Sequence, residues 1–140
     1  MKPGYRLLNS PPTLSDYLRL RSESGLTPKT EEQARPVLDG SWTICHVVHE
    51  ATGEVVGMGR VLGDGGWYFH IADMAVLPDH QRRGLGDAIL TALLERIRAA
   101  APTGARVNLL ADPPGRRLYE RHGFAETAPR SVGMEMVLDS

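Results

Sequence analysis

The chain has 140 residues, a formal net charge of −1 and a pI near 6.5. This length predicts one domain, residues 1–140, with room for a sizeable core, and the balanced charge gives no sign of nucleic-acid binding. The single cysteine, Cys45, excludes an internal disulfide and suits a reducing compartment, so we expect a cytoplasmic protein. We expect neither a signal peptide nor a membrane span, because no apolar run approaches the required length.

The first forty residues predict one strand and two helices. Residues 5–8 form a short apolar strand that ends at a segment rich in turn-forming residues. A helix is expected over residues 14–24, with its leucines and Tyr17 facing inward. A second, short helix opens at Thr27 or Thr30, and Pro36 should lie near its boundary because proline lacks the N–H that a helix interior needs.

Three antiparallel strands are expected next, over residues 42–48, 55–62 and 67–77. The segment between the first two has hairpin composition, and Gly53 can supply the positive φ that a tight turn needs. The third strand is largely apolar and partly β-branched, which is typical of a buried strand.

A glycine-containing basic loop and a helix follow the third strand. From Leu85 onward an apolar residue recurs every four positions, which predicts an amphipathic helix. Its N-terminal N–H groups and dipole favour an anion, and Gly84 and Gly86 would let a phosphate approach the backbone. Because Arg82 and Arg83 add positive charge, the junction predicts a pyrophosphate site.

The last forty residues predict two strands and a helix. A strand is expected over residues 106–111 and a helix over 114–122, which Gly123 would end. Alternating apolar residues over 134–138 predict a closing strand.

Two segments carry a resemblance to a known family. Gln81-Arg-Arg-Gly-Leu-Gly86, after a strand that ends in Val76-Leu-Pro78, resembles the acetyl-CoA-binding segment of the GCN5-related N-acetyltransferase (GNAT) superfamily. The segment Leu118-Tyr-Glu-Arg-His-Gly-Phe124 resembles a second motif of the same superfamily. The resemblance covers residues 42–138 and implies an α/β (α+β mixed) GNAT-like fold, with a central mixed, mostly antiparallel sheet flanked by helices on both faces.

The same resemblance implies that acetyl-CoA is the co-substrate. Loop amides would hold its pyrophosphate, and the end of the preceding strand would pair with its pantetheine arm. Asp112 stands where the family often has asparagine, and a carboxylate can accept a hydrogen bond but cannot donate one as an amide does. The residues that the resemblance assigns to the co-substrate are Met74, Ala75, Val76, Gln81, Arg82, Arg83, Gly84, Leu85, Gly86, Asp87 and Asp112.

Three residues are candidates for catalysis. Tyr119 matches the family's general acid, and a tyrosine with a pKa near ~10 stays protonated at neutral pH. His70 and Asp73 lie in a segment that resembles a strand of glucosamine-phosphate acetyltransferases. Histone-type and arylalkylamine-type members of the superfamily carry Glu or His at the His70 position, where it acts as the base or as a water relay. His70 and Asp73 have opposite parity along a strand, so only a β-bulge would bring both to the same face.

The sequence therefore predicts an acetyl-CoA-dependent N-acetyltransferase that acetylates a primary amine of a small molecule by direct attack in a ternary complex. A sugar-phosphate N-acetyltransferase and a non-catalytic acyl-CoA-binding module are the alternatives. We expect no metal, because Cys45 and His46 point to opposite faces of one strand and no second cluster completes a site. We also expect no nucleic-acid or membrane partner. The acceptor and the existence of a homodimer stay open.

Overall fold

The computed structural model describes residues 1–139, and the chain divides into two compact units, Met1–Leu109 and Leu110–Ser140. The first unit contains a five-stranded sheet and three α-helices. The second contains a short 3₁₀ segment and one short helix. Within residues 1–139 no helix combines the length and the apolar character needed to cross a bilayer.

The sheet has the strand order β1-β2-β3-β4-β5. Its strands are β1 (Tyr5–Leu8), β2 (Thr43–His49), β3 (Glu54–Gly63), β4 (Tyr68–Val76) and β5 (Arg106–Asn108). Strands β1 to β4 pair with one another in antiparallel fashion, and β5 pairs with β4 in parallel. This confirms the prediction of a mixed, mostly antiparallel sheet.

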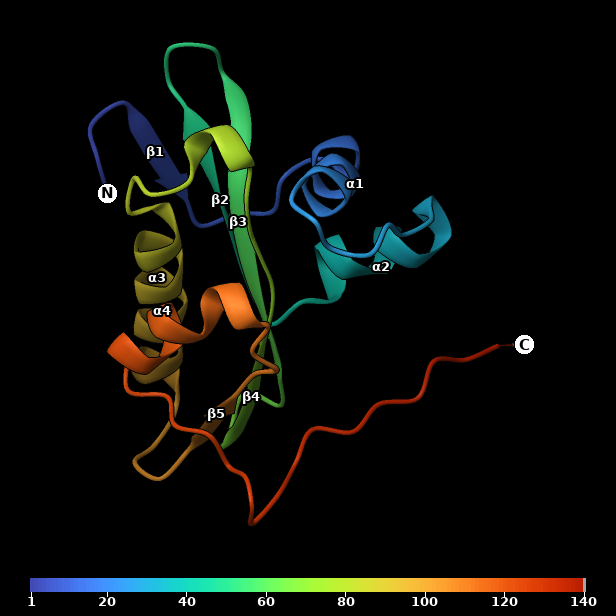
Figure 1. The fold of residues 1–140 in the computed structure, drawn as a ribbon, viewed down its shortest axis with the longest axis vertical. Helices are drawn as coiled ribbons and strands as arrows, with labels where there is room; N and C mark the ends of the chain where they lie inside the picture. Colours follow the sequence, from blue (N-terminus) through green and yellow to red (C-terminus); the bar gives the residue numbers. More distant parts are fainter. Residues whose placement is uncertain (140) are drawn as a thin grey trace. The chain divides into compact units, whose positions relative to one another are not determined.

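Helices cover both faces of this sheet, as predicted. Helices α1 (Leu14–Glu23) and α2 (Glu31–Gly40) lie on one side, and α3 (Leu85–Ala100) lies on the other (Figure 1). A Cβ at Gly59 of β3 would lie only 2.6 Å from the Ile89 side chain of α3. Glycine therefore allows α3 to pack closely against the sheet.

The apolar stripe predicted for α3 is the buried face of that helix. It packs on the sheet, and the charged residues of the opposite face are exposed. Burial of such a stripe supplies most of the stability of a helix in a protein. The buried residues of α3 are Leu85, Ile89, Leu90, Leu93, Leu94 and Ile97.

Helix α2 begins as predicted but does not end where Pro36 suggested. Thr30 is its N-cap: its hydroxyl accepts a hydrogen bond from the Gln33 N–H, while Gln33 bonds back to the Thr30 N–H. The expectation that Pro36 lies near the helix boundary is wrong, because α2 continues to Gly40. Because Pro36 has no N–H, the carbonyl of Glu32 lacks its helical hydrogen bond. Glu32 is exposed, so water can bind this carbonyl instead.

Strand β4 changes character halfway along its length. It pairs with β5 only at three positions, of which the last joins His70 to Asn108. Three residues further on, Asp73 has a φ of 55°, and the register with β3 shifts between Met58 and Arg60. This bulge bends β4, which explains why β5 is shorter than the strand predicted over residues 106–111.

The second unit contains η2 (Pro113–Gly115) and α4 (Arg116–Arg121). The predicted closing strand over residues 134–138 is wrong: the segment has no strand hydrogen bonding, and Met134 is 88% exposed. Alternating apolar residues form a strand only when an edge is available for pairing, and residues 110–139 contain no other strand.

Candidate active site

The loop between β4 and α3 has the backbone geometry of an anion site. Gly84 is the N-cap of α3 with a φ of 78°, and Arg82 also has a positive φ of 62°. The first intrahelical bond runs from the Ala88 N–H to the Gly84 carbonyl over 3.1 Å. The amides of Gly84, Leu85 and Gly86 precede that bond, so they have no acceptor within the helix and lie at the positive end of the helix dipole, as an anion site requires.

Side chains around this loop hold its shape. The Gln81 side-chain amide donates to the Val76 carbonyl over 3.0 Å, which joins the loop to the end of β4. Arg83 donates to the Tyr5 hydroxyl over 3.0 Å. The Leu85 side chain is buried, so only its backbone can reach a ligand. A Cβ at Gly84 would make a tight contact of 3.2 Å with the Met1 backbone, and the positive φ of this position also disfavours a side chain.

The predicted pantetheine segment lies along an open edge. Within residues 1–109 no strand pairs with β4 on the β5 side after His70, so residues 71–76 lack a strand partner there, and only the Val76 carbonyl has the Gln81 side chain as a donor. Alternate residues of such an edge direct N–H and C=O groups outward. Met74, Ala75 and Val76 belong to this edge, and the strand ends two residues before the 3₁₀ turn η1 (Pro78–His80) that enters the loop.

His70 forms a hydrogen-bonded row with two neighbours on the α1/α2 face of the sheet. The Asn108 side-chain amide donates to the Tyr68 hydroxyl over 2.6 Å, so its oxygen faces His70 Nδ1, also at 2.6 Å. With the amide in this orientation, Nδ1 carries the proton and Nε2 keeps its lone pair. This tautomer leaves a basic nitrogen on a half-buried side chain.

The bulge brings Asp73 to the same face as His70. Register places His70 opposite Leu62, and Arg60, two residues earlier on β3, is on that face too. Asp73 accepts hydrogen bonds from Arg60 Nε at 2.6 Å and from the Tyr17 hydroxyl at 2.5 Å, and it pairs with Arg21. The bulge that the parity argument required is therefore present.

Asp73 is a buried carboxylate surrounded by strong hydrogen-bond donors. Its side chain is only 7% exposed. Burial raises the pKa of Asp73, but the Tyr17 hydrogen bond and the charges of Arg60 and Arg21 outweigh burial and hold that pKa below its usual value. Burial and the neighbouring carboxylate raise the pKa of Tyr17 to about 12, so Tyr17 is a neutral donor. The cluster fixes α1 to the strained residue of β4.

The second unit contains Tyr119 and Asp112. The Tyr119 ring lies over Gly115, where a Cβ would be 2.9 Å from ring atom Cε2, and stacks edge-on with Phe124 at 6.1 Å between centroids. Burial and then the Asp112 charge raise the pKa of Tyr119. Asp112 is exposed and makes no side-chain cap bond to η2.

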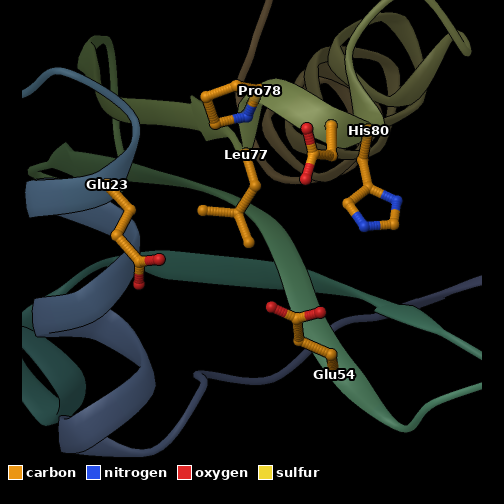
Figure 2. A pocket seen from close by; sticks show the side chains of 6 residues that line it. Glu23, Glu54, Leu77, Pro78 and His80 are labelled. Carbon is orange, nitrogen blue, oxygen red and sulfur yellow. The ribbon is translucent and has the colours of Figure 1, made fainter.

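An acidic cleft lies beside the 3₁₀ turn. It has a volume of about 340 Å³ and is lined by Glu23, Glu54, Leu77, Pro78, Asp79 and His80. Figure 2 shows Glu23 of α1, Glu54 of β3 and Leu77 pointing toward one space. Three carboxylate residues make this cleft unsuited to a pyrophosphate. Arg19 pairs with both glutamates, at 3.6 and 3.2 Å.

Residues 1–139 contain no group of three or more His, Cys, Asp or Glu side chains that could hold a metal ion. Cys45 is buried, and burial raises the pKa of its thiol to about 12. His46 Nδ1 lies 2.6 Å from the Ser10 carbonyl, which gives that ring a structural partner.

Sequence reasoning missed the partners of Asp73. Tyr17 and Arg21 are four residues apart on α1, and that spacing puts them on one helix face. Tyr17 was expected to pack inward, and nothing local indicates a carboxylate more than fifty residues away. The same is true of Asn108, which only the register of β4 and β5 brings to His70.

Fold and loop together define an acetyltransferase of the GNAT class. The family model described as "Acetyltransferase (GNAT) domain" matches residues 41–126, more than half of the chain, so the chain belongs to this family. A Staphylococcus aureus structure described as a protein of unknown function and probable acetyltransferase is 34% identical. It covers 96% of this chain and 99% of its own, with a TM-score of 0.91.

Two further matches are more distant. A GNAT family acetyltransferase from Streptococcus pneumoniae is 24% identical, covers 97% of this chain and 98% of its own, and shares the fold with a TM-score of 0.76. An uncharacterized N-acetyltransferase of Pyropia yezoensis is 29% identical over 85 residues, 61% of this chain. The chain spans about half the length of the first two curated relatives it matches.

Proposed function

We propose that this chain is an acetyl-CoA-dependent N-acetyltransferase that acetylates a primary amine of a small molecule. One observation carries the proposal: the unpaired edge of β4 over residues 71–76 leads directly to the N-terminus of α3. An open strand edge binds an extended amide chain, and a helix N-terminus binds a pyrophosphate. Acetyl-CoA has both parts in that order, and GNAT enzymes generally use it.

The loop residues divide this binding between backbone and charge. The amides of Gly84, Leu85 and Gly86 would donate to the pyrophosphate, and the exposed Arg82 would add positive charge. Met74, Ala75 and Val76 would offer backbone groups to the pantetheine amides. Gln81 would act by holding the loop to Val76, through the bond that it already makes. Acetyl-CoA supplies the acetyl group as a thioester.

We propose His70 as the base, acting directly or through one water. Its Nε2 has a lone pair because Nδ1 faces the Asn108 oxygen at 2.6 Å. Asp73 is a poorer base, because both of its oxygens accept hydrogen bonds and its pKa is lowered. Asp73 would instead hold the bulge that exposes the edge of β4.

Tyr119 is the proposed general acid for the departing thiolate. Its raised pKa keeps the hydroxyl protonated at neutral and moderately alkaline pH, so it can donate as negative charge develops on sulfur. This role requires the two compact units to act together, so we also propose that residues 1–140 form a single domain.

Thiol release from acetyl-CoA, measured across a panel of primary amines, tests the function. We expect amine-dependent release, with an acid limb in kcat/KM that His70→Ala removes and Asp73→Asn retains. If His70→Ala keeps the acid limb of kcat/KM and Asp73→Asn loses it, then Asp73 is the base instead of His70. Tight acetyl-CoA binding without release for any amine would contradict the enzyme and favour a binding module.

A further inference from the structure

Arg60 differs from the other arginine of the Asp73 cluster in how much of its guanidinium is engaged. Arg21 donates from Nε and Nη2 to the Thr27 carbonyl, at 2.9 and 2.7 Å, and pairs with Asp73 through Nη1. Arg60 donates to Asp73 through Nε and reaches the Ser41 hydroxyl only at 3.4 Å. Within residues 1–139 no hydrogen bond engages Nη2 of Arg60.

The exposure of the two arginines agrees with this difference. The Arg60 side chain is 15% exposed and the Arg21 side chain 11% exposed. A guanidinium has five N–H donors, so Arg60 still has donors that a ligand could use. Its side chain is also largely withdrawn from water. Charge-assisted hydrogen bonds are stronger in such an environment than on an open surface.

The cluster also has an excess of positive charge. Arg21 and Arg60 contribute two positive charges, Asp73 contributes one negative charge, and Tyr17 is neutral. One uncompensated positive charge beside a binding face favours a monoanion such as a carboxylate, since a phosphate dianion would call for more cationic partners.

Register places this charge next to the proposed base. Arg60 is opposite Ala72 and His70 is opposite Leu62, so Arg60 and His70 are diagonal neighbours on one face. Diagonal neighbours across antiparallel strands lie about 7–8 Å apart. A small molecule that places its amine at His70 therefore reaches Arg60 with a second group.

We propose that Arg60 binds a carboxylate of the acceptor, so that the acceptor is a small amino acid or another amino carboxylate. The inference rests on the proposed function and names the substrate class of the same site. Arg60 would orient the acceptor by a charge-assisted hydrogen bond, while the bond from its Nε to Asp73 keeps the side chain in place.

The test compares each amino acid with its own carboxamide. Thiol release is measured for α- and ω-amino acids and their amides, in the wild type and in Arg60→Gln, Arg60→Lys and Arg19→Gln. The ratio of kcat/KM for acid to amide, taken within one variant, does not depend on how much of the protein is folded. Arg19→Gln also removes one positive charge, but from the exposed cluster beside the acidic cleft.

We expect a wild-type acid-to-amide ratio above ten for at least one pair, falling toward one in Arg60→Gln. Arg60→Lys should be intermediate, and Arg19→Gln should match the wild type. A wild-type ratio near one for every pair, an unchanged ratio in Arg60→Gln, or a preference for O-phosphoethanolamine over all carboxylates would overturn the proposal.

A binding measurement separates this proposal from the enzymatic one. If no amine is acetylated, the proposed function fails, and calorimetric titration of the same amino acids and amides into the CoA-bound protein decides the subsite. Binding of an acid but not its amide, lost in Arg60→Gln and kept in Arg19→Gln, supports the subsite. Absence of such binding overturns it.

Discussion

The two halves of β4 differ in whether they have a strand partner on the β5 side. Residues 68–70 pair with β5, and His70 lies beside Asn108. Residues 71–76 have no strand partner on that side within residues 1–109. Pairing with β5 ends after His70, and three residues further on Asp73 has a φ of 55°, which is rare outside glycine. In the proposed function, one half of β4 would supply a catalytic side chain and the other half would supply backbone groups.

An open edge needs support from elsewhere, because a strained residue persists only where its surroundings hold it. Here the support is the buried cluster of Tyr17, Arg21, Arg60 and Asp73. A second cluster, around Arg19, is partly exposed and joins Asp16, Glu23 and Glu54. Loss of a buried ion pair lowers the free energy of unfolding far more than loss of an exposed ion pair. Matched substitutions in the two clusters therefore test the role of the buried one.

The largest effect is expected for Asp73→Asn, which removes the charge while asparagine still tolerates a positive φ. Two buried arginines would lose their counter-ion, so the free energy of unfolding should fall by about 3–5 kcal/mol at pH 7. Glu54→Gln, in the exposed cluster, should change it by at most about 1 kcal/mol. Urea unfolding measures both.

The pH dependence of that difference follows from the Asp73 pKa. Because the folded-state pKa is lowered, the charge contributes stability above the unfolded pKa of about 3.9 and loses that contribution as pH falls through the folded value. The gap between wild type and Asp73→Asn should therefore narrow below about pH 4. A gap that stays constant from pH 7 to pH 3 would contradict the ion-pair account.

The next largest effect concerns Tyr119, the proposed general acid, which lies outside β4. Tyr119→Phe keeps the ring over Gly115 and deletes the hydroxyl, so kcat should fall roughly 100-fold with little change in acetyl-CoA affinity. Steady-state kinetics and calorimetry separate the two quantities. Unchanged turnover would make Tyr119 a packing residue.

Gly84 tests the loop at the end of the open half. Both Gly84→Ala and Gly84→Asp place a Cβ at a φ of 78° and against Met1, so their difference isolates the added negative charge. We expect acetyl-CoA to bind Gly84→Asp at least about tenfold more weakly than Gly84→Ala, or about 1.4 kcal/mol. Equal affinities, with both variants folded, would argue against a pyrophosphate at this loop.

The smallest effect is expected for Asn108→Leu, in the paired half. Losing the bond to Nδ1 frees the His70 ring and tautomer, so kcat/KM should fall by about tenfold or less. Nitrogen chemical shifts of His70 give an independent readout, since they report which ring nitrogen carries the proton. A wild-type tautomer ratio in Asn108→Leu would remove the positioning role of Asn108.

The sequence predicted the elements that local patterns control. The α3 stripe from Leu85 to Ile97, the positive φ of Gly53 and the capping Thr30 all follow from spacing and side-chain chemistry. The loop with its glycines and the helix start after it were predicted for the same reason, and the pyrophosphate role of this loop stays a prediction.

What the sequence could not give depends on contacts between distant residues. Asp73 meets Tyr17 and Arg21 only where α1 packs on the sheet, and no local pattern places Asp73 at a bulge. The prediction that Pro36 lies near a helix boundary used only local rules. Proline is tolerated inside α2 because water can bind the carbonyl that loses its N–H partner. The closing strand over 134–138 failed because alternation alone supplies no pairing partner.

Amide hydrogen exchange, measured with and without acetyl-CoA, tests the central claim most directly, since it reports on the open edge itself. The account predicts slower exchange over residues 71–76 and 84–86 when acetyl-CoA is bound, with little change in β2, which is paired on both sides. Saturating acetyl-CoA that leaves residues 71–76 unprotected would contradict the account, because the co-substrate would then lie elsewhere.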